Sequence, residues 1–134
     1  MSISEADIEI LTRYRIDRAY EAIEEAELLI DNDKLKLAVS RIYYGMFYIL
    51  TALALKYNFK TSKHKELVGW FNKNFIKDKK IGQSYGAMMR KAFKSRNDSD
   101  YADFIEFEKQ DVEKMFSEMK DFIYTIENYI EQTL

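Results

Sequence analysis

The chain has 134 residues, which predicts a single domain long enough to bury a substantial core. Apolar residues make up 47% and charged residues 33%, a balance that favours a globular protein over a disordered one. Cys is absent, which excludes disulfide and thiol chemistry and fits a cytoplasmic location.

The charged N-terminus and the longest uncharged run argue against a secreted protein and a membrane-spanning protein. The N-terminus carries charges from its first residues, so no secretory signal is expected. The longest uncharged run, residues 42–55, is shorter than the roughly 20 residues that cross a bilayer.

The formal net charge of −2 conceals an uneven distribution. Between Lys56 and Arg96 there are 12 Lys or Arg and two acids, whereas the flanks carry 9 basic and 21 acidic residues. The middle segment therefore has a net charge of +10 and the flanks −12. One interpretation is internal neutralisation, with basic helices lying against acidic ones. The other is a surface that faces phosphate groups.

The first helix is expected to begin near Ser2 or Ser4, because Ser2 and Glu5 have the spacing of a capping box. It should end at residues 31–34, where Asp and Asn side chains compete for backbone hydrogen bonds. Its apolar residues recur at helical spacing. They are Ile8, Leu11, Ala19, Ala22, Ile23, Ala26, Leu29 and Ile30.

A second helix is predicted over residues 34–57, and it is apolar on nearly every side. A helix of this kind is buried on most of its faces. We therefore expect it to be the central helix of a bundle or to lie partly against another subunit. Its aromatic residues are assigned to the core or to a dimer interface, where aromatic side chains are enriched. They are Tyr43, Tyr44, Phe47 and Tyr48.

Three more helices are predicted in the second half. The third is expected to have Thr61 or Ser62 as its N-cap, the fourth to cover residues 81–94, and the fifth to cover residues 107–132. The polar stretch KAFKSRNDSDYADF, residues 91–104, follows the fourth helix. No strand or repeat is evident. The predicted fold is all-α, a single domain over residues 1–134 that forms an up-and-down antiparallel bundle of four to five helices.

Three segments together resemble one known family. The second helix contains AVSRIYYGMFYI, residues 38–49, the third begins within TSKHKELVGWF, residues 61–71, and the polar stretch contains RNDSDY, residues 96–101. This combination resembles a small prokaryotic branch of the HEPN superfamily, the higher eukaryote and prokaryote nucleotide-binding domains. The resemblance covers nearly the whole chain, and its informative part runs from the second helix to the fifth.

The resemblance implies a helical bundle that usually forms a homodimer. In the nuclease members, an Arg and a His with four to six residues between them cut RNA across the dimer, and an Asn often follows the Arg. Other members act with a small nucleotidyltransferase as a toxin–antitoxin system. The resemblance implies no cofactor.

When the motif is transferred residue by residue, Arg96 corresponds to the family's Arg, and Asn97 corresponds to the polar residue that follows it. The His should fall at 101, 102 or 103, where this chain has Tyr101, Ala102 and Asp103. Tyr is usual there in the branch that this chain resembles. RNA cleavage without a metal requires a group that exchanges protons near neutral pH. His has an unperturbed pKa of about 6.5 and suits this role. Tyr, with a pKa of about 10, is mostly neutral and suits it poorly.

The remaining candidates have structural alternatives. Asp100 could cap a helix or pair with Arg96 instead of contacting a ligand, and Tyr101 could anchor its segment in the core. His64 is the one histidine of the chain. It could be satisfied by backbone groups, or folding could bring it near Arg96 to supply the missing acid–base group. A single His without clustered carboxylates predicts no metal site.

The sequence thus supports a preferred interpretation and two alternatives. The preferred one is a HEPN-like homodimer that binds nucleotide or RNA phosphate through Arg96, Asn97, Asp100 and Tyr101, and that works with a nucleotidyltransferase in a toxin–antitoxin pair. The first alternative is a metal-independent ribonuclease that uses Arg96 and Asn97 with His64 or Tyr101. The second is a protein-interaction adaptor without a nucleic-acid role.

Overall fold

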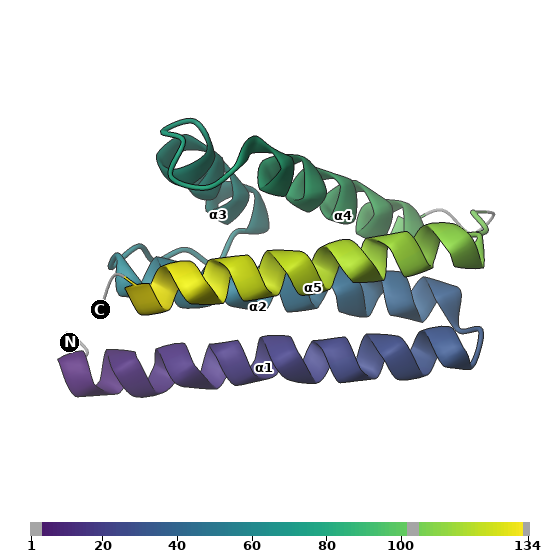
Figure 1. Ribbon diagram of the computed structural model, residues 1–134, viewed down its shortest axis with the longest axis horizontal. Helices are drawn as coiled ribbons and strands as arrows, with labels where there is room; N and C mark the ends of the chain where they lie inside the picture. The colour runs from purple at the N-terminus through teal and green to yellow at the C-terminus, as the bar shows by residue number, and fades with distance from the viewer. Residues whose placement is uncertain (1–3, 102–104, 133–134) are drawn as a thin grey trace.

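The structure is a computed structural model that describes residues 4–101 and 105–132, with only the backbone of residues 100 and 101. Within these ranges the fold is all-α, as predicted (Figure 1). Its elements, in chain order, are α1 (Glu5–Asp31), α2 (Leu35–Lys56), α3 (His64–Phe71), the π-helical segment η1 (Asn72–Ile76), α4 (Gln83–Tyr101) and α5 (Lys109–Gln132).

Helix α2 is the centre of the bundle. It contacts α1, α3, α4 and α5, and α1 and α4 lie on opposite sides of it (Figure 1). Its length and composition would also allow it to cross a membrane, but 67% of its most apolar window is buried inside the protein. Here α2 serves as a core helix, which confirms the prediction that a helix apolar on all sides is central.

Small residues allow α1 to pack closely against α2. Ala19, Ala22 and Ala26 are fully buried along α1. Gly45 of α2 faces this row, and a Cβ atom at Gly45 would lie 3.0 Å from the Cβ of Ala22 and 2.3 Å from the end of Met119 on α5. Gly45 therefore fits the point where α1, α2 and α5 come closest together.

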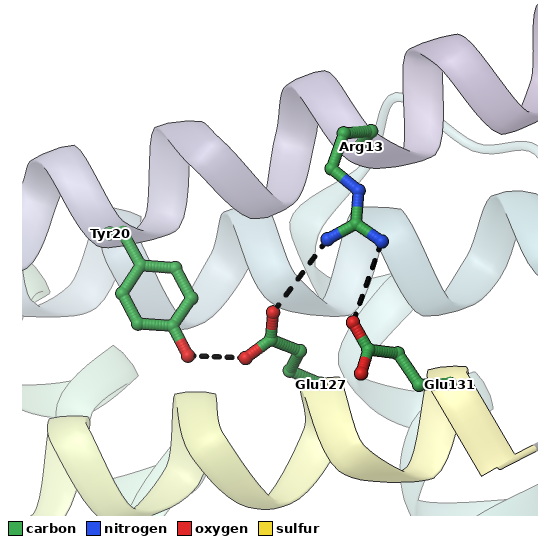
Figure 2. Close-up of polar contacts among 4 residues, drawn as sticks. All are labelled: Arg13, Tyr20, Glu127 and Glu131. Atoms are coloured by element: carbon green, nitrogen blue, oxygen red, sulfur yellow. Dashed lines mark hydrogen bonds and ion pairs between the residues drawn. The ribbon is translucent and has the colours of Figure 1, made fainter.

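Polar contacts join α1 to α5 at the edge of this core (Figure 2). The hydroxyl of Tyr20 donates to Oε1 of Glu127, and Arg13 lies 3.8 Å from Oε2 of Glu127 and 3.4 Å from Oε1 of Glu131. Partial burial and, secondly, the nearby Glu127 carboxylate raise the pKa of Tyr20, so this phenol stays a neutral donor.

The apolar face of α5 has the predicted periodicity. It buries Val112, Met115, Met119, Phe122, Ile123, Ile126 and Ile130.

Helix boundaries agree with the sequence in some places and differ in others. Ser4 caps α1 by accepting from the N–H of Asp7 at 3.2 Å, while Ser2 lies outside the described residues. The predicted N-cap of the third helix was wrong. Lys63 occupies that position without a side-chain cap, and Thr61 instead accepts from the Lys63 N–H at 3.1 Å. Thr61 therefore orders the turn before the helix, because its hydroxyl satisfies the backbone N–H of the N-cap residue.

The fourth helix is longer than predicted. It runs to Tyr101 and does not end near residue 94, so Arg96 and Asn97 lie on a regular helix and not on a loop. The polar composition of this stretch suggested a helix end. Beyond Lys94, however, Arg96 donates to Tyr44 of α2 and Ser99 donates to the carbonyl of Lys36, and such tertiary contacts override weak local propensity.

Gly45 provides a test of the close packing around α2. Gly45→Val should lower the free energy of unfolding by about 1–3 kcal/mol, since overpacking a core costs this much. Gly69→Ala is a matched control, because a Cβ there has nothing within 4 Å. It should raise the free energy of unfolding by roughly 0.5–1 kcal/mol through helix propensity. Urea unfolding measures both. Equal stability of the two variants would contradict the close packing at Gly45.

Candidate functional site

Two adjacent tyrosines of α2 organise the candidate site. Tyr43 is fully buried, and Tyr44 is partly exposed and packs against the core. Their rings meet edge to face with centroids 5.4 Å apart. Each hydroxyl contacts one of the polar residues that the sequence singled out, so α2 joins residues from α3 and α4.

His64 is the first residue of α3, and Tyr43 and Phe47 of α2 hold it. Its Nδ1 lies 2.7 Å from the hydroxyl of Tyr43. Its ring stacks on Phe47 with centroids 4.0 Å apart, at an interplanar angle of 23°. The imidazole is therefore fixed both by a hydrogen bond and by an aromatic face, which leaves little freedom for it to rotate.

Arg96 reaches the same cluster from α4. Its Nη2 donates to the hydroxyl of Tyr44 at 2.9 Å, and its Nη1 lies 3.4 Å from Oδ1 of Asn97. The guanidinium carbon is 5.7 Å from the ring centre of Tyr43 and 5.4 Å from that of Tyr44, within the range of cation–π attraction. Folding thus brings Arg96 and His64 to one place, where both contact the tyrosine pair.

The electrostatics of the cluster keep His64 neutral. Burial and, secondarily, the positive charge of Arg96 lower the pKa of His64 below its ordinary value. Burial raises the pKa of Tyr43, against a smaller opposing effect of Arg96, so Tyr43 remains a phenol. The phenolic proton of a fully buried Tyr needs an acceptor, and Nδ1 of His64 is in place to accept it. The proton of the neutral imidazole is then on Nε2.

This arrangement favours binding over proton transfer. Arg96 supplies a permanent positive charge, and Nε2–H of His64 would supply a neutral donor, a combination that can hold a phosphate oxygen. A general base needs a free lone pair on a group that titrates near neutral pH. In His64 the lone pair of Nδ1 already accepts from Tyr43, and the lowered pKa further reduces its basicity.

The other predicted residues have different positions. Phe47 belongs to the cluster, while Tyr48 lies apart and accepts from Arg18 of α1 at 3.3 Å. Asp98 pairs with Lys94 at 3.5 Å, as a surface acid would. Asp100 and Tyr101 are the last residues of α4, and their side chains lie outside the described part of the structure, as do Ala102 and Asp103.

The sequence did not reveal that Tyr43 and Tyr44 contact His64 and Arg96. Both were assigned to the core or an interface on the basis of hydrophobicity alone. Two adjacent tyrosines next to buried aliphatic positions were the available signal, because a buried Tyr needs a partner for its hydroxyl.

Comparison with known proteins identifies the family. The HEPN domain family matches residues 12–129, which is most of the chain. The chain belongs to the HEPN family. It is 35% identical over 123 residues to a UPF0332 protein of Thermotoga maritima, covering 92% of this chain and 93% of that one.

Two further relatives carry a functional name. A protein of Methanocaldococcus jannaschii named "Putative toxin MJ0142" is 30% identical over 115 residues, covering 86% of this chain and 78% of that protein. A second protein of the same organism, "Putative toxin MJ0605", is 28% identical and covers 89% of this chain.

The single histidine makes the cluster accessible to NMR. We expect His64 in the native protein to carry its proton on Nε2 and to titrate below its ordinary pKa of about 6.5. Because the unfolded chain then binds this proton more tightly than the native state, the His64 contribution to stability is lost as the pH falls below that value. Long-range ¹H–¹⁵N correlation spectra recorded across a pH series measure both properties.

Tyr43→Phe should raise the pKa of His64, because the hydrogen bond from Tyr43 favours the neutral imidazole. Tyr44→Phe is the control, since its hydroxyl contacts Arg96 and not Nδ1 of His64. If the native imidazole carries its proton on Nδ1, the assigned direction of the Tyr43–His64 hydrogen bond is wrong.

Proposed function

We propose that this HEPN protein binds RNA or nucleotide phosphate at the cluster of Arg96 and His64, and that it is the toxin-like component of a toxin–antitoxin pair. The observation that carries the proposal is the orientation of Arg96, which Tyr44 holds beside a neutral His64. A guanidinium in this position gives an oxyanion a charge-assisted contact. The names of the two Methanocaldococcus jannaschii relatives support the toxin-related part of the proposal.

The proposal includes two protein partners. The first is a second copy of the chain, because the family resemblance implies a homodimer and because large apolar side chains are exposed on α1, among them Ile10, Tyr14 and Leu28. The second is a nucleotidyltransferase, as in the toxin–antitoxin pairs of the HEPN family.

Arg96→Ala tests the phosphate site. The variant should weaken RNA or nucleotide binding by about 1 kcal/mol or more, as expected for the loss of a charge-assisted hydrogen bond. Binding to the native protein should also weaken as salt rises, because phosphate contacts release counterions. Fluorescence anisotropy with a labelled oligoribonucleotide measures both effects.

Lys91→Ala is the matched control for Arg96→Ala. It removes the same charge from the same helix, but the Lys91 ammonium lies against Glu118 at 3.4 Å, away from the tyrosine pair. If Arg96→Ala and Lys91→Ala bind RNA as the native protein does, Arg96 is structural and the phosphate site at Arg96 is wrong. If the native protein binds neither RNA nor nucleotide, the adaptor interpretation is the better one.

A metal-independent ribonuclease is the second candidate, because His64 lies in the same cluster as Arg96. We expect little cleavage by the native protein, since Nδ1 of His64 is occupied and the motif has Tyr101 in place of His. Tyr101→His should create or increase cleavage of a fluorogenic RNA if the loss of that base is what limits the reaction. Robust cleavage by the native protein that His64→Ala abolishes would instead establish the ribonuclease.

The homodimer has its own test. Light scattering at tens of micromolar protein should give twice the 16.0 kDa mass of the chain, a concentration at which a micromolar dissociation constant yields mostly dimer. A mass of one chain would contradict the dimer, and it would leave the phosphate site to be judged by the Arg96 variants.

A further inference from the structure

The basic middle of the sequence is only partly neutralised inside the protein. Lys91 and Lys94 form ion pairs with Glu118 and Asp98. In the part of the chain that the structure describes, Lys73, Lys77 and Arg90 have exposed side chains and no carboxylate within ion-pair distance. The prediction of internal neutralisation therefore fails for these three cations.

These three cations line one groove between η1 and the first half of α4. The groove has a volume of about 600 Å³. Its lining is Gly69, Asn72, Lys73, Ile76, Lys77, Gln83 and Arg90, and we call it the cationic groove. No acid lines it among the described residues, and its two amide side chains can hydrogen-bond to ribose hydroxyls or phosphate oxygens.

Two glycines shape the cationic groove. Gly86 of α4 lets η1 approach closely, since a Cβ there would lie 3.2 Å from Oδ1 of Asn72 and from Ile76. That Oδ1 atom is buried and has no hydrogen-bond partner among the described residues. Gly69 has open space where its side chain would be, which keeps the α3 side of the groove free.

The groove leads along α4 towards the phosphate site. Arg90 and Asn97 are seven residues apart, so they lie on the same face of the helix, about 10 Å apart along its axis. Asn97 in turn contacts Arg96. A ligand that follows this face of α4 would pass from the cationic groove to the cluster of Arg96 and His64.

We propose that the cationic groove binds the sugar–phosphate backbone of an RNA strand, as a second anion site beyond Arg96. Three unpaired cations and two amides suit a chain of phosphates and ribose hydroxyls. A protein partner would require an apolar centre with aromatic anchors, whereas the one large apolar residue of the groove, Ile76, is itself buried. This inference rests on the proposed function for one point, which is that the ligand is RNA.

The test compares the double variant Lys73→Glu/Arg90→Glu with the control Lys65→Glu/Lys114→Glu. Both make the same change in net charge at exposed positions, and neither Lys65 nor Lys114 lines the groove. For a labelled 20-nucleotide single-stranded RNA, the groove variant should bind roughly tenfold more weakly, or worse, while the control variant changes affinity much less.

The salt dependence should change as well. Each phosphate contact in a single strand contributes about 0.7 to the slope of log K against log[salt], so the slope should become shallower by about 1.4 in the groove variant. Binding of a mononucleotide should not change in this variant but should weaken in Arg96→Ala. Equal effects of the groove and control variants on affinity and slope would overturn the proposal.

Comparing the two variants separates the failure of this inference from that of the proposed function. If Arg96→Ala leaves RNA binding intact while the groove variant abolishes it, the groove stands and the phosphate site at Arg96 fails.

Inorganic polyphosphate and polyglutamate serve as competing polyanions that test whether the groove is specific for RNA. If the native protein binds polyphosphate but no RNA, or binds polyglutamate as tightly as RNA, the assignment of the groove to an RNA backbone is wrong. If it binds none of these polyanions, the groove is not an anion site.

Discussion

The close approach of α1 and α2 is the constraint on which the rest of the structure depends. Helix α2 carries apolar residues on almost every face, so it is stable in water only when other helices surround it. The small residues of α1 and Gly45 of α2 let one side close tightly. Met119 of α5 completes this side, which leaves the remaining faces of α2 for α3 and α4.

The same helix that forms the core also holds the candidate site. Met46 and Ile49 of α2 are buried among apolar neighbours, while Tyr43 and Tyr44 extend to the polar residues of α3 and α4. A tyrosine suits both roles, since its ring fills space in the core and its hydroxyl can donate or accept at the edge. The positions of His64 and Arg96 therefore depend on the packing of a helix that carries neither residue.

Much of the fold could be predicted from hydrophobic periodicity. The residues that α5 buries recur at the spacing of one helix face, and the all-round apolar character of α2 indicated its central position. The end of α4 could not be predicted, because the polar residues after Lys94 resemble a loop in composition. The contacts that these residues make, from Arg96 to Tyr44 and from Ser99 to Lys36, join distant parts of the chain. The π-helical segment after Phe71 had no signal in the sequence.

The candidate site was predictable in its residue types but not in its chemistry. The motif pointed to Arg96 and Asn97, and the isolated His64 was open to two interpretations. What the sequence could not show is which atom contacts which: the hydroxyl of Tyr43 lies 2.7 Å from Nδ1 of His64. Such a distance depends on three-dimensional packing and is invisible in a single sequence.

The division of the site among three helices has a consequence for local unfolding. His64 and Arg96 belong to α3 and α4, which contact α2 less extensively, among the described residues, than α1 and α5 do, whereas α1, α2 and α5 pack on one another. Cooperative units within a protein can open at a lower free energy than the whole chain. A partial opening that lifts α3 from α2 would separate His64 from Tyr43 while most of the helical content persisted. Mild denaturant would then disrupt the cluster of Arg96 and His64 before it reduced the circular dichroism signal.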